Sequence, residues 1–202
     1  MPKKQNKKEC DTKQKILSTA FDLFAQRGMR DISMREIAQA CKVSKPVIYY
    51  YFKDKDALCF ETVKDFGRRQ EERLLSTAAA NPDFAGFLEK LFASFLGKAA
   101  NKNMLSFLMH LHSYASSNPR IERRLKAQRA RSAGLMLDIL RAQEQSGKIA
   151  PGACYGAQHL ISASIMHMVL SSHHSHIKFR PTHAADIAKA ILKAVDYKGD
   201  IK

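Results

Sequence analysis

The sequence lacks the features that mark secreted, membrane-spanning and disulfide-bonded proteins. Its four cysteines stand singly at positions 10, 41, 59 and 154, without a closely spaced pair or a disulfide-like framework. No apolar run approaches the roughly 18 residues that a membrane-spanning helix needs, and no apolar stretch follows the basic N terminus. We therefore expect a cytoplasmic protein without a membrane partner, whose cysteines fill small apolar spaces.

Strand signals are almost missing as well. Period-two alternation of apolar and polar residues does not occur, whereas apolar residues spaced by three and four positions recur from end to end. We therefore predict an all-α fold. Asp54 is predicted to cap a long helix from Lys55 to about Leu75. Beyond it, turn-rich segments divide the C-terminal part into predicted helices over about 84–99, 104–116, 120–145, 153–171 and 182–195.

Acidic residues are scarce relative to basic ones. The chain has 19 aspartates and glutamates against 34 lysines and arginines, which gives a formal net charge of +15. A surplus of this size favours a polyanionic partner such as nucleic acid. No nucleophile elbow, Walker loop, HExxH motif or paired-carboxylate signature is present. We therefore predict a binding protein that is not an enzyme and needs no cofactor.

Clear helix boundaries mark the first sixty residues. The lysine-rich N terminus has no core-forming side chain and is predicted to be disordered. A helix follows, capped by Asp11 or Thr12 and ended by Gly28. Ser33 and Glu36 then form a capping box, in which each side chain binds a backbone N–H group at the start of the next helix.

A short third helix stands out because it is aromatic and bracketed by lysines. It is predicted to run from Ser44 to Phe52 with the sequence SKPVIYYYF. So short a helix is marginal in water, so Ile48 and Phe52 are expected to anchor it in the core. Three adjacent tyrosines cannot all point inward from one helix. The other face is therefore predicted to be exposed, as in a helix that enters the major groove of DNA.

Residues 12–58 resemble the DNA-binding domain of the TetR family of transcriptional repressors. The resemblance rests on a helix that ends in glycine, the pattern Ser-x-x-Glu-Ile-Ala, the tripeptide Val-Ser-Lys, and an aromatic run that ends Phe-Lys before the next cap. One position departs from the family pattern, because the turn residue that is often glycine is Lys42 here. A lysine in the left-handed conformation costs about 1 kcal/mol, so either the turn differs slightly from the family's or the fold absorbs the strain.

The resemblance implies a set of DNA contacts around the third helix. The residues nearest the base edges are expected to be Lys45, Pro46, Val47 and Tyr49, and Tyr50, Tyr51 and Lys55 are expected to hold phosphates. The complete set of expected DNA-binding residues is Arg35, Ser44, Lys45, Pro46, Val47, Tyr49, Tyr50, Tyr51 and Lys55.

We divide the chain into a disordered basic arm (residues 1–11), a helix-turn-helix DNA-binding domain (12–58) and a helical effector-binding and dimerisation domain (59–202). The arm either adds phosphate contacts or has no role, and the sequence leaves both open. In the last two predicted helices, apolar residues cover more of the circumference than one core contact needs. Part of that surface is expected to be buried against a second copy, as the resemblance implies.

The C-terminal domain is also expected to hold a small-molecule pocket. Apolar walls with a few polar groups are typical of ligand sites, and flexible methionines accept varied ligands. The same residues equally suit a helical core with satisfied histidines. The residues expected to line the effector pocket are Met104, Phe107, Leu108, His110, Tyr114, Met136 and Ile139.

Four histidines lie close together near the end of the chain, at positions 167, 173, 174 and 176. Such a cluster could bind a divalent metal. No acidic or cysteine ligand is close in sequence, so a solvated loop is the favoured interpretation and no metal is predicted.

The sequence therefore predicts a homodimeric repressor that binds a palindromic operator in double-stranded DNA and is released by an unidentified small-molecule effector. The alternative is a non-specific nucleic-acid-binding protein, and a helical enzyme or carrier is a weaker one. The effector, the operator and the choice between repression and activation stay open.

Overall fold

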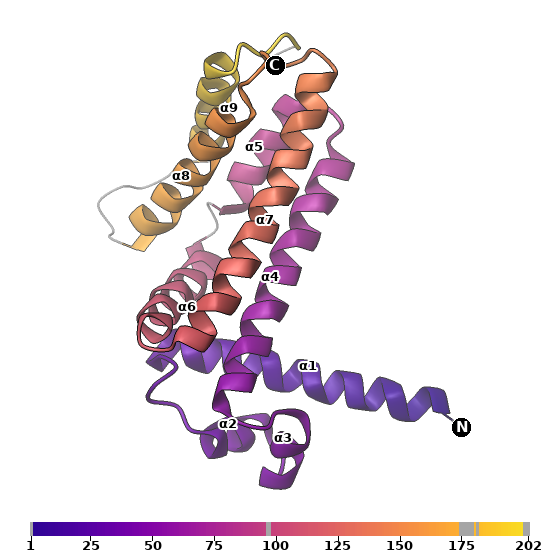
Figure 1. Cartoon of the computed structure of the whole chain (residues 1–202), viewed down its shortest axis with the longest axis vertical. Coiled ribbons are helices and arrows are strands. Elements are labelled where there is room, and N and C mark those ends of the chain that lie inside the picture. Colours follow the sequence, from indigo (N-terminus) through magenta and orange to yellow (C-terminus); the bar gives the residue numbers. More distant parts are fainter. Residues whose placement is uncertain (1, 96–97, 174–179, 181, 200–202) are drawn as a thin grey trace. The chain divides into compact units, whose positions relative to one another are not determined.

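The computed structural model describes residues 2–95, 98–173, 180 and 182–199. All regular secondary structure in these ranges is helical, which confirms the all-α prediction. Figure 1 shows these helices, which are α1 (Pro2–Arg27), α2 (Met34–Cys41), α3 (Lys45–Tyr51), α4 (Lys55–Ala80), α5 (Phe84–Phe95), α6 (Lys98–Ser116), α7 (Pro119–Gln145), α8 (Cys154–His173) and α9 (Thr182–Ala194).

The chain forms two compact units. Unit 1 comprises residues 1–68 and 106–128, and unit 2 comprises residues 69–105 and 129–202. The long helices α4, α6 and α7 therefore each contribute to both units. The functional boundary expected after residue 58 remains a prediction.

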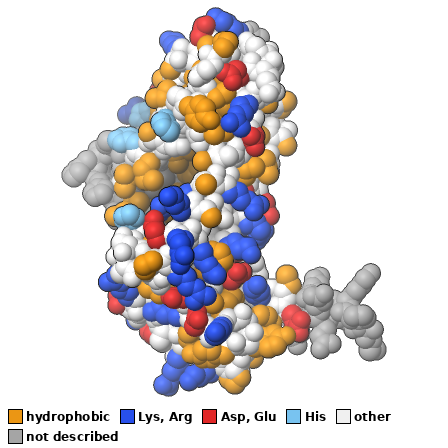
Figure 2. All heavy atoms as spheres, viewed as in Figure 1, with side chains coloured by type: hydrophobic (Ala, Val, Ile, Leu, Met, Phe, Trp, Pro, Cys, Tyr) orange, Lys and Arg blue, Asp and Glu red, His pale blue; other side chains and the backbone are white. Residues whose placement is uncertain are grey.

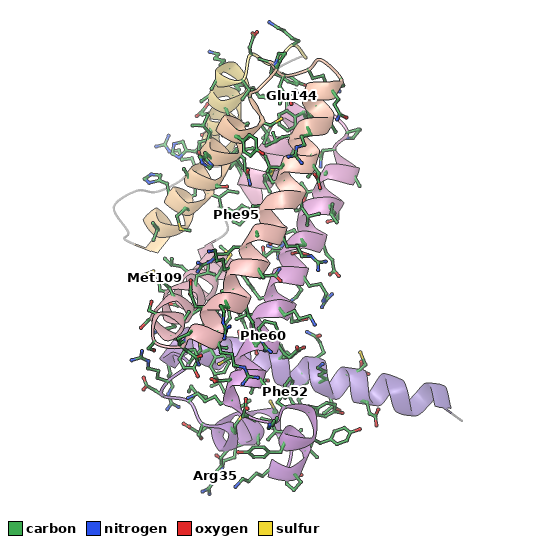
Figure 3. The ribbon with its side chains drawn as sticks, in the orientation of Figure 1. Arg35, Phe52, Phe60, Phe95, Met109 and Glu144 are labelled. Carbon is green, nitrogen blue, oxygen red and sulfur yellow. The ribbon has the colours of Figure 1, made fainter. Side chains whose placement is uncertain are left out.

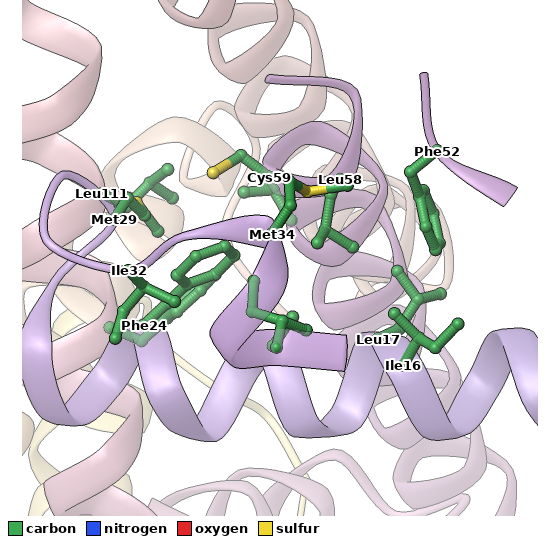
Figure 4. Close-up of a cluster of buried hydrophobic side chains, with 14 of the residues drawn as sticks. Ile16, Leu17, Phe24, Met29, Ile32, Met34, Phe52, Leu58, Cys59 and Leu111 are labelled. Atoms are coloured by element: carbon green, nitrogen blue, oxygen red, sulfur yellow. The ribbon is translucent and has the colours of Figure 1, made fainter. Parts of the chain in front are cut away.

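Unit 1 has a closed apolar core. Phe24 of α1, Ile37 of α2 and Leu58 of α4 are fully buried in it, and Figure 4 shows part of this cluster. Ile48 and Phe52 join the same core, which confirms that they anchor α3. Burial of each large apolar side chain stabilises the fold by about 1.5–3 kcal/mol, so the short α3 is held by packing.

The N-terminal arm differs from the prediction. Helix α1 begins at Pro2 and continues without a break to Arg27, so the residues expected to be disordered have a helical backbone. Lysine, glutamine and glutamate favour helix, and proline is tolerated in the first turn. The arm contains no glycine and no inner proline that would stop the helix from extending.

Several helix ends follow the predicted signals. Gly28 ends α1 with a φ of 83°, and its N–H donates to the carbonyl of Phe24 at 3.0 Å. The carboxylate of Asp54 accepts from the N–H of Ala57 at 2.7 Å and so caps α4. Ser44 occupies the N-cap position of α3, but its hydroxyl makes no capping hydrogen bond.

Two later helices are longer than predicted. Helix α4 extends to Ala80, beyond the predicted end near residue 75, and α6 begins at Lys98 rather than near 104. Residues 98–103 read KAANKN, and lysine and alanine are good helix formers even without an apolar face. Helix α5 ends at Phe95, and residues 96–97 lie outside the described ranges.

Unit 2 has a separate core. Phe92 of α5, Leu140 of α7 and Ile161 of α8 are buried in it, and α5 packs against α8 and α9. The N–H of Ala150 donates to the carbonyl of Val195 at 3.0 Å, which ties the loop before α8 to the end of α9. Across the part of the chain that the structure describes, no helix has the length and apolarity needed to cross a membrane.

Candidate nucleic-acid interface

The start of α2 is set by a complete capping box. The Ser33 hydroxyl accepts from the N–H of Glu36 at 3.2 Å, and a Glu36 carboxylate oxygen accepts from the N–H of Ser33 at 2.8 Å. Arg27 at the end of α1 lies 2.9 Å from the other carboxylate oxygen. These contacts fix where α2 begins and hold it to α1.

The capping box also lowers the pKa of Glu36 from its ordinary value of 4.5 to about 2. The main cause is the hydrogen bond from the Ser33 N–H, followed by the Ser33 hydroxyl and Arg27. Because the pKa is lower in the folded chain than in the unfolded chain, the ionised carboxylate stabilises the fold above pH 4.5. That contribution is lost as the pH falls toward 2.

We expect Glu36→Gln to reduce the free energy of unfolding at pH 7, and the difference from the native protein to shrink between pH 4.5 and pH 2. Glutamine keeps the shape of the capping box but not its charge. Urea unfolding at a series of pH values measures this. Glu89→Gln, which removes a charge from an exposed position of α5, serves as control, and a pH-independent difference at Glu36 would contradict the prediction.

The turn between α2 and α3 is built on a left-handed lysine. Lys42 has φ 57° and ψ 41°, so the turn keeps the left-handed conformation that suits glycine, and the lysine bears the strain. Its N–H donates to the carbonyl of Gln39 at 3.0 Å, and the N–H of Val43 donates to the carbonyl of Ala38 at 3.0 Å. These bonds close the end of α2 and set the direction in which α3 departs.

Helix α3 presents its aromatic face to solvent. Tyr49 is 43% exposed and Tyr50 is 73% exposed, and the Lys45 ammonium lies 6.0 Å from the centre of the Tyr49 ring. Pro46 is exposed and Val47 is half-buried. The structure therefore brings the residues expected near the base edges together at the start and middle of one exposed helix.

Two of the expected phosphate contacts have partners inside unit 1. Tyr51 is half-buried and packs against the core, with its ring edge-on to Tyr50 at 5.0 Å. The Lys55 ammonium donates to the backbone carbonyl of Arg30 at 2.7 Å. Tyr51 and Lys55 thus brace the fold, and their contact with phosphate stays a prediction.

The exposed side of α2 extends the same polar surface. Arg35 is exposed and points outward from α2 (Figure 3). Gln39 and Lys42 are also exposed, although neither was among the expected DNA contacts. Gln39 lies four positions after Arg35, which places both on one side of α2, and this spacing is the signal that identifies Gln39.

Lysines without acidic neighbours in the sequence lie along this surface. Figure 2 shows lysine and arginine side chains gathered on the visible face of unit 1. Residues 37–53, which include the end of α2, the turn and all of α3, contain three lysines and no aspartate or glutamate. Exposed aromatic rings among uncompensated lysines are suited to a polyanion such as duplex DNA.

The residues expected to line an effector pocket divide between the two units. Phe107, Leu108, His110 and Tyr114 belong to unit 1, and Met104, Met136 and Ile139 belong to unit 2. This division arises because α6 contributes to both units. A single pocket lined by all seven residues therefore stays a prediction.

Three of these residues have clear structural roles within unit 1. Phe107 is fully buried, with its ring 4.6 Å from that of Phe21. The Tyr114 hydroxyl donates to the carboxylate of Asp56, which lowers the pKa of that carboxyl. The Nδ1 atom of His110 lies 3.1 Å from the position that a Cβ at Gly28 would take, so the ring packs closely on that glycine.

The histidine cluster falls partly outside the described ranges, which include neither His174 nor His176. His167 is exposed on α8, and His173 is the last residue of that helix. Among the residues that the structure describes, no group of three histidine, cysteine or acidic side chains is placed to hold a metal ion.

A comparison with known protein families matches the same region of the chain. Residues 16–62, which contain the core of α1, the capping box, the turn and α3, match the family described as bacterial regulatory proteins, tetR family. This region of the chain is similar to the TetR family. Its members are regulators of transcription rather than enzymes.

Curated TetR-family relatives match mainly in this N-terminal region. The regulator AcrR of Shigella flexneri is 41% identical over 61 residues, which cover 30% of this chain and 28% of AcrR. EthR of Mycobacterium tuberculosis is 37% identical over 67 residues, which cover 33% of this chain and 31% of EthR. The chain thus spans less than two thirds of the length of these relatives, between 21% and 35% of the first four.

Solved structures resemble the fold over nearly the whole chain. The fatty acid degradation regulator FadR of Bacillus halodurans aligns with a TM-score of 0.76 at 17% identity, covering 93% of this chain and 97% of FadR. FadR of Bacillus subtilis, solved in complex with stearoyl-CoA, aligns with a TM-score of 0.71 at 19% identity, covering 90% and 96%. At such low identity the likeness extends the TetR-family fold to the C-terminal helices without assigning a ligand.

Proposed function

We propose that this protein is a homodimeric transcriptional repressor that binds a palindromic DNA operator through α3 and is released by a small-molecule effector. The observation that supports this best is the exposure of Tyr49 and Tyr50 on a short helix whose opposite side, Ile48 and Phe52, is fully buried. Packing holds such a helix rigidly at the surface. The exposed rings and Lys45 then face a groove and its phosphates.

The surface of α8 supports a second copy of this chain as partner. Tyr155, Leu160 and Met166 are 61%, 43% and 50% exposed. The whole of α8 contains no aspartate, glutamate, lysine or arginine, although 26% of the chain is charged. An uncharged helix with exposed large apolar side chains fits a self-complementary interface. A two-fold dimer would place two copies of α3 about 34 Å apart, one turn of DNA.

A small apolar or amphipathic molecule is the proposed effector. The stearoyl-CoA in FadR of Bacillus subtilis is bound by a protein of the same fold. Release of DNA requires that the effector bind one arrangement of the dimer more tightly than the other. The protein is proposed to act in the cytoplasm, bound to DNA.

Selection from random duplex DNA at moderate salt tests the proposed function. The purified full chain is incubated with the pool, and the retained duplexes are sequenced. We expect enrichment of a palindrome whose half-sites are spaced by about one helical turn. Its loss for the variant Tyr49→Ala would link the enrichment to α3.

The alternative of non-specific nucleic-acid binding has a distinct outcome in the same experiment. The net charge of +15 favours binding to any duplex. Retention of all sequences with equal affinity, abolished by salt, would replace the operator-binding proposal with this alternative. An enriched sequence without two-fold symmetry would retain specific binding and reject the symmetric dimer.

A further inference from the structure

The backbone at Lys42 is in a conformation that a lysine rarely adopts. Among the described residues, only Lys42 and Asp196 have positive φ without being glycine, whereas Gly28, Gly147 and Gly152 occupy the other such positions. The hydrogen bonds that close α2 require this conformation whatever the side chain is. Glycine would adopt it without steric conflict, so the lysine side chain brings strain with it.

Nothing in the described part of the chain offsets that strain. The Lys42 side chain is exposed, and no hydrogen bond or ion pair links its ammonium to another described residue. Asp196 differs in both respects, because aspartate tolerates this conformation better than most residues and its carboxylate lies 2.6 Å from Lys198. No acidic residue occurs between Glu36 and Asp54 to attract Lys42.

The position of Lys42 relates it to the DNA-facing surface. It directly follows α2, whose residues Arg35 and Gln39 are exposed, and precedes Lys45, the first residue of α3, by three positions. A lysine side chain extends several ångströms from its backbone as a flexible point charge. Residues held in strained conformations concentrate at functional sites.

We propose that Lys42 is a DNA-contacting residue that binds a backbone phosphate from the turn between α2 and α3. This inference rests on the proposed operator binding and adds to it a contact that the glycine usual at this position cannot make. The contact is independent of base sequence, because a phosphate is present at every step of the duplex. Lys42 therefore raises affinity for DNA in general at the expense of fold stability.

Three substitutions separate strain from charge. Lys42→Gly removes both, Lys42→Gln removes the charge and keeps the strain, and Lys42→Arg keeps both. Binding is measured by fluorescence anisotropy between 50 and 300 mM salt, on the selected operator and on a random-sequence duplex of about 30 base pairs. Thermal unfolding is followed at one fixed protein concentration. Asp196→Gly relieves the other left-handed residue, in unit 2, and is the matched control.

We expect Lys42→Gly and Lys42→Gln to weaken binding to both duplexes by about fivefold or more. The slope of log affinity against log salt should fall by about 0.9 for each lost phosphate contact, or about 1.8 for a dimer. Lys42→Arg should retain the native slope. Lys42→Gly should also raise the melting temperature by roughly 2–4 °C, whereas Lys42→Gln should not. Asp196→Gly should leave the slope unchanged.

Each of the other outcomes rejects the inference and shows which step of the argument is wrong. A native slope for Lys42→Gly, while the native protein binds DNA, would show that Lys42 makes no phosphate contact and would leave operator binding standing. A lower slope for Asp196→Gly as well would trace the effect to the fold. Failure of the native protein to bind either duplex would reject the proposed function together with this inference.

Discussion

The double variant Lys45→Ala/Tyr49→Ala is expected to bind the operator about 100-fold more weakly than the native protein. Both side chains lie exposed at the start and middle of α3, and the Lys45 ammonium lies over the Tyr49 ring at 6.0 Å. Each protomer would lose about 1–1.5 kcal/mol of DNA contacts, and a dimer loses that amount twice. Anisotropy titration of a labelled operator at fixed salt measures the loss.

The native fold and the dimer should survive this double substitution, because neither side chain belongs to the core of unit 1. Sedimentation and circular dichroism check both. Lys90→Ala, at an exposed position of α5 in unit 2, controls for the change in net charge and should leave affinity within about twofold. Unchanged operator affinity in both single variants, Lys45→Ala and Tyr49→Ala, would exclude α3 as the reading helix.

The substitution Phe52→Ala is expected to lower the free energy of unfolding by about 3–5 kcal/mol, as is usual for a buried phenylalanine cut to alanine. Phe52 is 1% exposed, and its N–H caps α3 by donating to the carbonyl of Ile48 at 2.9 Å. The substitution removes one of the two side chains that anchor α3 and leaves a cavity in the core. Total stabilities are about 5–15 kcal/mol, so DNA binding should fall with the fold. Urea unfolding measures the change.

Tyr50→Ala is the matched control, because it removes an aromatic ring two positions away that is 73% exposed. Its effect on the free energy of unfolding should stay within about 0.5 kcal/mol. Equal losses at Phe52 and Tyr50 would mean that the exposed face of α3 packs against protein in solution. The assignment of that face to DNA would then fail.

Agreement between sequence and structure is closest where a signal acts over a few residues. The capping box of Ser33 and Glu36, the terminal Gly28 and the cap at Asp54 all form as predicted. Each satisfies backbone groups within one helical turn, so its energetics need no knowledge of the rest of the chain. The conformation at Lys42 was left open by the sequence, and the structure shows that the left-handed turn is kept.

The sequence analysis missed features that depend on helix propensity without an apolar face, or on a contact with a residue far away in the sequence. The lysine-rich residues before Asp11 lack an apolar face, yet their backbone continues α1 to Pro2 because nothing in them interrupts a helix. The expected contact of Lys55 with phosphate stays a prediction, and its ammonium binds the carbonyl of Arg30, which is 25 positions away. No pattern of neighbouring residues predicts such a contact.

The sequence by itself determined the helical class, the boundaries of α2 and α3, and the TetR-family identity of residues 16–62. Only the tertiary structure decided which residues each buried face packs against and how the residues of α4, α6 and α7 divide between the two units. It placed Phe107 and Tyr114 in the core of unit 1, but Met136 in that of unit 2. Caps and turns depend on neighbours along the chain, whereas burial depends on residues brought together from far apart, and apolar spacing alone does not name the partner.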